Sequence, residues 1–310
     1  MQYYEYNIPN SVSNIVAGVD EAGRGPLAGP VVAAAVILPE EHQISGLNDS
    51  KKLTEKNRVK LYKEISDLAQ ISIGIVSHRI IDKNNILNAT YLAMEKAILG
   101  LKTKPDLSLI DGYGLPNDNI KNEGIIRGDS KVESISAASI IAKVTRDTLM
   151  QKINPIFPEF KFAKHKGYGT KYHIEILKKL KATPIHRKSF APVKNNLPTK
   201  KVFKNKKKLT QLSIQLASLD YIRRGYEIKN IEWNSDEFGR INIIVKKNNH
   251  FKIVDIRVKN GFPSSDELRE VLSSSKKTIV EQNLDENILI DVASFSLKKP
   301  SIDIYSDINK

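Results

Sequence analysis

Short apolar segments that we predict to be β-strands recur through residues 15–127, and three of the five end at acidic residues. The strands are expected over residues 15–20, 30–38, 71–76, 107–110 and 124–127. Asp20 and Glu21 end the first, Asp111 ends the fourth, and Asp129 follows the fifth after Gly128. Helical patterns alternate with these strands, over residues 56–68, 89–100, 134–151 and 172–180. This alternation predicts an α/β fold with helices on both faces of one sheet.

Carboxylates at strand ends are the main chemical signal in this half of the chain. In open α/β sheets, functional groups gather just beyond the strand ends. Carboxylates brought together there repel one another unless a divalent cation neutralises them. Oxygen ligands without histidine or cysteine favour Mg²⁺ or Mn²⁺, and a pair of such ions supports phosphodiester hydrolysis. Taken singly, each acid is more often a turn or capping residue than a ligand.

The chain is strongly basic and contains no cysteine. It has 49 Lys and Arg against 35 Asp and Glu, a formal net charge of +14. This charge favours nucleic acid as a partner, although an acidic membrane surface or a ribosomal contact would give the same sum. The absence of cysteine excludes disulfides, thiolate zinc sites and iron–sulfur clusters. With no signal-peptide pattern and no apolar run long enough to span a bilayer, we expect a cytoplasmic protein without membrane contact.

The length of 310 residues predicts two domains, which we place at residues 1–197 and 209–310. Between them, residues 198–208 form a proline-led, lysine-rich linker that could also bind phosphates non-specifically. Its six lysines are Lys200, Lys201, Lys204, Lys206, Lys207 and Lys208. Residues 209–310 carry 15 basic and 15 acidic residues, so this part has no net charge.

The second domain is predicted to be a small α/β unit with the order αβββαβ. Its helices are expected over residues 209–224 and 266–281. Its strands are expected over residues 227–233, 240–246, 251–258 and 288–295. The three middle strands are joined by hairpin-like connections.

The segment GVDEAGRGPLAGP, residues 18–30, strongly resembles ribonuclease HII, the type 2 ribonuclease H. Further matching blocks follow in family order, over roughly residues 13–193. They are LNDSKKL (47–53), IDG (110–112), GDSK (128–131), SAAS (136–139), AK (142–143), HKGYGT (165–170) and HRKSF (186–190). The type 3 family lacks this Gly-Arg-Gly turn and carries an extra N-terminal domain, so type 2 fits better. The resemblance implies a ribonuclease H-like mixed sheet flanked by helices.

By that resemblance, Asp20, Glu21, Asp111 and Asp129 are the catalytic, metal-binding acids for Mg²⁺ or Mn²⁺. The implied enzyme is a metal-dependent endonuclease that acts in ribonucleotide excision, DNA replication and repair. It would cleave RNA in RNA–DNA hybrids, and duplex DNA on the 5′ side of an embedded ribonucleotide. The products would carry a 3′-hydroxyl and a 5′-phosphate.

The same resemblance implies a set of substrate-binding residues. Glycines in a Gly-Arg-Gly turn let backbone amides approach the ribose 2′-hydroxyl, and Tyr168 resembles the tyrosine that stacks on the sugar after the RNA–DNA junction. Ser50, Lys51 and Lys52 precede a predicted helix and are expected to contact phosphate. Lys143 and Arg146, one helical turn apart, could face phosphate or only solvate their helix. The substrate-binding residues are Gly23, Arg24, Gly25, Ser50, Lys51, Lys143, Arg146 and Tyr168.

Other polar residues in the matching blocks receive weaker assignments. His165 and His186 are given a phosphate or structural role, and a zinc role is disfavoured because no third soft ligand is present. We do not expect Asp49, Asp118 or Asp147 to bind metal, although Asp49 lies in a matching block.

The second domain resembles a small bacterial family with a restriction-endonuclease-like fold. That family carries Gly-Glu-Ile-Asp on one strand and Glu-Val-Lys on the next. Here the functional positions hold Arg240, Asn242, Asp255 and Arg257. Because arginine and asparagine cannot replace carboxylate ligands, we expect this domain to be inactive as a nuclease. It could be a DNA-binding or scaffolding module with an unknown partner, although its zero net charge argues against strong DNA binding. The alternative is an unrelated small α/β domain with a packing role.

Two other functions remain open at this point. One is a DNA resolvase of the ribonuclease H type, which would have no use for a 2′-hydroxyl sensor. The other is a non-catalytic hybrid-binding or scaffolding protein, which would not need intact acids. We expect a monomer that binds RNA–DNA hybrids and ribonucleotide-containing duplex DNA.

Overall fold

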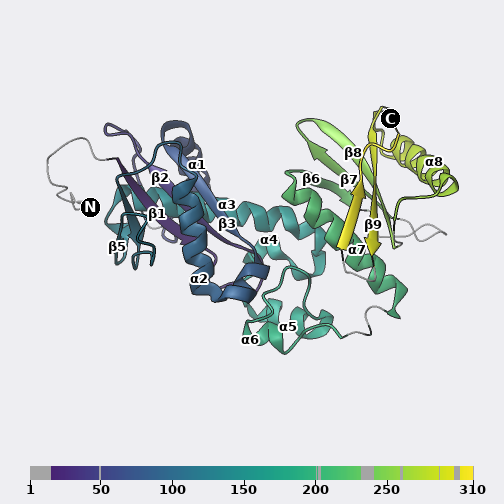
Figure 1. The fold of residues 1–310 in the computed structure, drawn as a ribbon, viewed down its shortest axis with the longest axis horizontal. Coiled ribbons are helices and arrows are strands. Elements are labelled where there is room, and N and C mark those ends of the chain that lie inside the picture. Colours follow the sequence, from purple (N-terminus) through teal and green to yellow (C-terminus); the bar gives the residue numbers. More distant parts are fainter. Residues whose placement is uncertain are drawn as a thin grey trace. The chain divides into compact units, whose positions relative to one another are not determined.

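The computed structural model describes residues 15–48, 50–199, 201, 204–231, 241–258, 261–285, 287–296 and 301–309. Two five-stranded sheets lie in two compact units (Figure 1). The first unit comprises Met1–Met150, His165–Glu175 and Ile185–Asn195, and the second comprises Gln151–Lys164, Ile176–Pro184 and Asn196–Lys310. The expected boundary at residue 197 therefore differs from the structure, because two segments before it group with the C-terminal sheet.

The first sheet is mixed, with the strand order β3-β2-β1-β4-β5. Strands β1, β2 and β3 pair antiparallel, whereas β4 runs parallel to both β1 and β5. The continuous apolar run of the second strand is explained by its burial on both faces. The strands are β1 (Val16–Ala22), β2 (Val31–Ile37), β3 (Gln70–Val76), β4 (Leu107–Asp111) and β5 (Asn122–Ile125).

Helices cover both faces of this sheet, as expected. Helix α2 (His78–Leu99) packs on the face that carries Ala33 and Ala35. Helices α1 (Glu55–Leu68) and α3 (Glu133–Ile153) pack on the face that carries Ala34 and Val36. Alternate residues of one strand point to opposite faces, so β2 contributes to both cores.

Helix α2 is the largest departure from the expected elements of the first unit. It begins at His78, eleven residues before the expected start at residue 89, and is interrupted at Asn85, where φ is 64° and ψ is 170°. Residues 78–88 are mostly polar and gave no apolar periodicity. The remaining short helices are η1 (Gly128–Ser130), η2 (Asn154–Ile156), η3 (Pro158–Phe160), α4 (Phe162–His165), α5 (Lys171–Leu180) and α6 (Ala191–Lys194).

The second sheet has the order β10-β9-β8-β7-β6, with β8 and β9 parallel and the other pairs antiparallel. Its strands are β6 (Glu227–Ile231), β7 (Ile241–Lys247), β8 (His250–Arg257), β9 (Leu289–Ser296) and β10 (Ser301–Tyr305). The last strand was not expected, so the order is αβββαββ. Helices α7 (Lys206–Arg223) and α8 (Ser265–Glu281) belong to this unit.

The lysine-rich linker is shorter than expected. Asn205 caps α7 by accepting a hydrogen bond from the backbone N–H of Lys208, so Lys206, Lys207 and Lys208 belong to the first helical turn. Lys200 lies outside the described residues. In the described part of the chain, no helix combines the length and the apolar character that crossing a membrane requires.

Candidate active site

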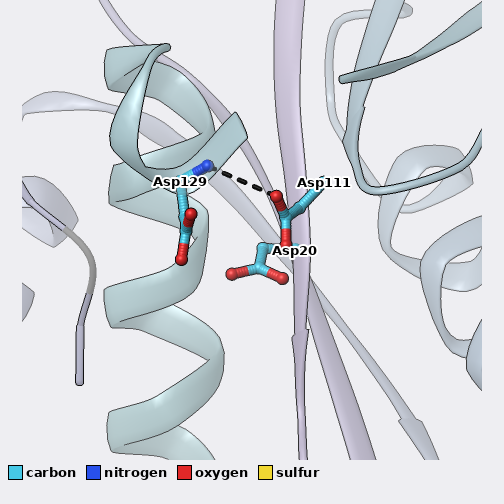
Figure 2. A group of neighbouring side chains, drawn as sticks. All are labelled: Asp20, Asp111 and Asp129. Carbon is cyan, nitrogen blue, oxygen red and sulfur yellow. Dashed lines mark hydrogen bonds between the residues drawn. The ribbon is translucent and has the colours of Figure 1, made fainter. Parts of the chain in front are cut away.

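Three of the predicted acids converge beside the adjacent strands β1 and β4 of the first sheet (Figure 2). Asp20 lies on β1, Asp111 ends β4 and Asp129 lies in η1, and one ligand oxygen from each falls within 4.8 Å of the other two. The parallel pairing of β1 with β4 sets Val19 opposite Ile110, which brings the two following aspartates side by side. The backbone N–H of Asp129 donates to Asp111 Oδ1 at 3.4 Å and ties η1 to the end of β4.

Glu21 is not part of this group of three. It follows Asp20 on β1, its backbone N–H donates to Asp20 Oδ1 at 2.6 Å, and its Oε1 lies 3.5 Å from Arg24 Nη1. Successive side chains of a strand point to opposite faces, which accounts for the separation. The negative charge of Asp111 nevertheless contributes to raising the pKa of Glu21, so the two carboxylates interact.

The electrostatics of the cluster favour a bound cation. Burial raises the pKa of Asp20 well above its ordinary value, and the charges of Glu21 and Asp111 raise it further. Burial is also the main cause that raises the pKa of Glu21. Crowded, desolvated carboxylates are destabilised when ionised, and a divalent cation removes that cost. Three carboxylates with hard oxygen donors therefore fit Mg²⁺ or Mn²⁺.

The Gly-Arg-Gly turn begins directly after β1 and lies against Tyr168. Gly23 has a φ of +101°, a conformation that side-chain-bearing residues rarely adopt. A Cβ placed on Gly25 would lie 3.6 Å from Tyr168 Cε1, and Tyr168 is 42% exposed. The structure thus brings together the turn and the tyrosine that were expected to contact the substrate.

Comparison with known proteins agrees with this site. The family model of ribonuclease HII matches residues 17–193. The chain belongs to the ribonuclease HII family. Ribonuclease HII of Acetivibrio thermocellus is 54% identical over 191 residues, covering 61% of this chain and 75% of the relative. Ribonuclease HII of Desulfitobacterium hafniense (strain Y51) is 53% identical over 183 residues, covering 59% and 70% respectively.

A solved structure of ribonuclease H2 from Pyrococcus horikoshii OT3 has a TM-score of 0.49 and 29% identity, covering 58% of this chain and 95% of that one. Membership of the ribonuclease HII family makes the chain a metal-dependent ribonuclease H, a hydrolase with endonuclease activity. Members of this family act on RNA–DNA hybrids. The family match ends at residue 193 and leaves the second sheet outside it.

Two residues expected to contact phosphate in this ribonuclease HII are buried instead. Ser50 is 3% exposed, and its Oγ lies 2.8 Å from Ser139 Oγ, which in turn hydrogen-bonds the Asp20 carboxylate. Arg146 is 1% exposed and donates from Nε to Pro30 O at 3.0 Å and from Nη2 to Ala28 O at 3.2 Å. In this structure both side chains hydrogen-bond protein groups, and their expected phosphate contacts stay predictions.

The three lysines expected to contact phosphate, Lys51, Lys52 and Lys143, remain accessible to a phosphate backbone. Lys51 is exposed in the turn before α1, which Thr54 caps by accepting a hydrogen bond from Asn57 N. Lys143 Nζ lies 3.1 Å from Asp147 Oδ1 and 5.9 Å from the ring centroid of Tyr168. Asp147, which was not expected to bind metal, forms an ion pair with Lys143. Asp49, the other such acid in this region, lies outside the described residues.

The histidines expected in a phosphate or structural role form an interior contact. His186 and His173 are both fully buried, with their Nε2 atoms 3.0 Å apart, and His173 Nδ1 lies 2.8 Å from Tyr168 O. His165 stacks on His173 with ring centroids 4.6 Å apart. No sequence signal marked His173, which lies outside the matching blocks. Arg187 lay inside a matching block but received no role.

In the second unit, the positions that resemble a nuclease motif do not form a comparable cluster among the described residues. Asp255 is fully buried on β8, opposite Asn242 of β7. Arg257 Nη2 lies 3.2 Å from Glu267 Oε2. Arg240 lies outside the described residues.

Proposed function

We propose that this ribonuclease cleaves RNA in RNA–DNA hybrids and cuts duplex DNA on the 5′ side of a single embedded ribonucleotide. The products carry a 3′-hydroxyl and a 5′-phosphate. The observation that carries the proposal is the convergence of Asp20, Asp111 and Asp129 within 4.8 Å at the point where β1 enters the Gly-Arg-Gly turn. The acid on β1, Asp20, thereby lies three residues before the turn that would read the ribose.

Asp20, Asp111 and Asp129 would hold two Mg²⁺ or Mn²⁺ ions, with Glu21 as the fourth acidic ligand. Such a pair of ions supplies an activated water and stabilises the leaving oxygen of the phosphodiester. The protein orients the acids through neighbouring groups, since Ser139 and the backbone N–H of Glu21 both hydrogen-bond Asp20.

The ribose is read by the turn and the tyrosine. In this proposal, backbone amides of residues 23–25 bind the 2′-hydroxyl, and the Tyr168 ring packs on the next sugar and excludes one that bears a second hydroxyl. The exposure of the Tyr168 ring and its position against Gly25 support this division of roles. Lys51, Lys52 and Lys143 contact phosphates on either side.

We infer a non-catalytic role for the second domain, as a DNA-binding or scaffolding module. Arg257 forms an ion pair with Glu267, which supports a structural use of the position where a nuclease would carry its lysine. The whole chain is expected to act as a cytoplasmic monomer in ribonucleotide excision during DNA replication and repair.

The proposal is tested with three duplexes of one sequence: an RNA–DNA hybrid, a DNA duplex with one ribonucleotide, and all-DNA. Cleavage of the first two with Mg²⁺ or Mn²⁺, and none of the third, is expected. Mapping the ends of the second duplex distinguishes a 5′ cut from a 3′ cut. Cleavage of the all-DNA duplex at a similar rate would instead favour a resolvase-like nuclease.

A further inference from the structure

Arg187 is a fully buried arginine whose hydrogen bonds all end on one loop. Its guanidinium donates to Gly23 O at 2.6 Å, Arg24 O at 2.8 Å, Gly29 O at 3.1 Å and Pro30 O at 3.1 Å. Its side chain is 0% exposed, and the Phe190 ring centroid lies 5.2 Å from its Cζ. The planar fork of arginine matches several carbonyls at once, which the single ammonium of lysine cannot do.

Burying this cation is costly in free energy. Burial lowers the pKa of Arg187 to about 9, and the nearby charge of Arg146 acts in the same direction. Among the residues that the structure describes, no carboxylate forms an ion pair with either arginine. The charge of Asp82 offsets part of this cost, and the direct partners of the guanidinium are the four backbone carbonyls.

The direction of the peptide groups in the Gly-Arg-Gly turn indicates what Arg187 does for this turn. In a trans peptide the C=O and the following N–H point in opposite directions. Because the carbonyls of Gly23 and Arg24 point at Arg187, the amides of Arg24 and Gly25 point away from it. Both of these residues are exposed, and neither amide has an acceptor within the described part of the chain.

The segment that carries Arg187 also fixes the position of Tyr168 through two sets of contacts. Arg187 N donates to Leu27 O at 2.8 Å, and Leu27 N donates to Gly167 O at 2.8 Å, next to Tyr168. The neighbouring His186 contacts His173, whose Nδ1 donates to Tyr168 O. One short segment thereby fixes both the turn and the tyrosine.

We propose that Arg187 is a positioning residue that sets the amides of Arg24 and Gly25 at the correct distance from Tyr168 to recognise a ribose. The inference rests on the proposed function, in which these amides bind the 2′-hydroxyl. Arg187 itself does not touch the substrate. Replacing Arg187 would reduce the preference for a duplex with a ribose over one with only deoxyribose, and would affect nucleic-acid binding in general much less.

The test compares Arg187→Lys with wild type in the full chain. The dissociation constant is measured for a DNA duplex with one ribonucleotide and for the all-DNA duplex, with Ca²⁺ replacing the catalytic metal. The ratio of the two constants is expected to fall about tenfold in the variant, because misplaced amides lose their bond to the 2′-hydroxyl. Leu61→Ala, a buried change on α1, is the control; it should lower the melting temperature and leave the ratio unchanged.

A folded Arg187→Lys protein with the wild-type ratio would overturn the inference. If that variant does not fold, Phe190→Leu decides, because it keeps the guanidinium and removes the ring beside it. A ratio reduced about threefold supports the inference, and an unchanged ratio contradicts it. A wild-type protein that does not itself distinguish the two duplexes would refute the proposed function rather than the role of Arg187.

Discussion

At the scale of single residues, the site depends on carboxylates held where their ionisation is unfavourable. Asp20 and Asp129 are 5% and 7% exposed, and Asp20 is fixed by hydrogen bonds from Ser139 and from Glu21 N. Such positions destabilise a metal-free protein, and a bound divalent cation would remove that cost.

Asp111→Asn is expected to lower the rate of incision by more than about a hundredfold, because the amide removes one charged metal ligand. The fold should remain, since the change also relieves repulsion of Asp20. Incision rates and melting temperatures check both expectations. Asp118→Asn, at an exposed acid outside the cluster, is the matched control and should behave like wild type. Near-normal activity of Asp111→Asn would remove this residue from the site.

His173 predicts a loss of stability in mild acid. Burial lowers its pKa to about 4 from an ordinary 6.5, so the folded state binds fewer protons than the unfolded state. The stability that neutral His173 contributes is complete above the pKa it has in the unfolded chain. This stability is lost as the pH falls from 6.5 towards 4, by up to about 1.4 kcal/mol per pH unit. Protonation would also set two N–H groups against each other at the His186 contact.

Urea unfolding of wild type and His173→Gln between pH 7.5 and pH 4.5, at values of about one unit apart, checks this dependence. The variant should lose less stability on acidification than wild type. Some dependence should persist, because burial also lowers the pKa of His78 to about 4. Identical slopes in the two proteins would show that His173 does not titrate as described.

For single residues, the sequence predicted which residues belong to the site better than it predicted where their side chains point. The four acids and the Gly-Arg-Gly turn were found from their blocks, and three acids meet as expected. The inward orientation of Arg146 was not predictable, because spacing on a helix does not say which side chain reaches the interior, and Ser50 lies in a turn without any apolar pattern. Arg187 was missed because its partners are backbone carbonyls, which leave no pattern in a sequence.

At the scale of elements, the site requires β1 to lie very close to the start of α3. A Cβ on Gly18 would lie 2.1 Å from the backbone carbon of Ser134 in the first turn of α3. The close approach sets the distance between Asp20 on β1 and Asp129, which precedes the helix. Glycine is therefore required at residue 18 because a side chain would collide with α3, and not because of its backbone dihedral angles.

Gly18→Ala is expected to destabilise the protein by about 1–3 kcal/mol and to reduce incision per folded molecule, because it separates Asp20 from Asp129. Gly74→Ala is the matched control, since its Cβ would lie 1.9 Å from Ala93 O on α2, away from the acids. Both variants should melt earlier, and only the first should lose specific activity. Equal specific activities would contradict the role given to this approach.

The elements that sequence patterns predicted well are those with strong apolar periodicity. Strand β2 and helix α3 were found within a few residues of their bounds. The first turns of α2 were missed because residues 78–88 are polar and include the break at Asn85. Strand β10 was missed because it is a short edge strand, with five residues paired to β9 and too few positions for a clear pattern.

At the scale of the whole molecule, the question is what the basic charge outside the family match contributes. Lys207 and Lys208 are exposed at the start of α7, and the domain that follows has no net charge. These lysines are the part of the C-terminal region best suited to phosphate contact.

Lys207→Gln with Lys208→Gln should weaken duplex binding and lower the slope of log affinity against log salt by about 0.9 per lost phosphate contact. Lys276→Gln with Lys277→Gln, at exposed positions of α8, removes the same charge elsewhere and serves as the control. Affinity measured across a salt series distinguishes the pairs. The same slope in both double variants would make residues 198–208 a connector without a role in binding.

The most direct test is whether the 310-residue protein incises a DNA duplex that carries one ribonucleotide. With Mg²⁺ or Mn²⁺ we predict a single cut on the 5′ side of the ribonucleotide, loss of cutting in EDTA, and recovery when the metal is restored in excess. Absence of metal-dependent incision from folded protein would contradict the central claim that Asp20, Asp111 and Asp129 form the hydrolytic centre.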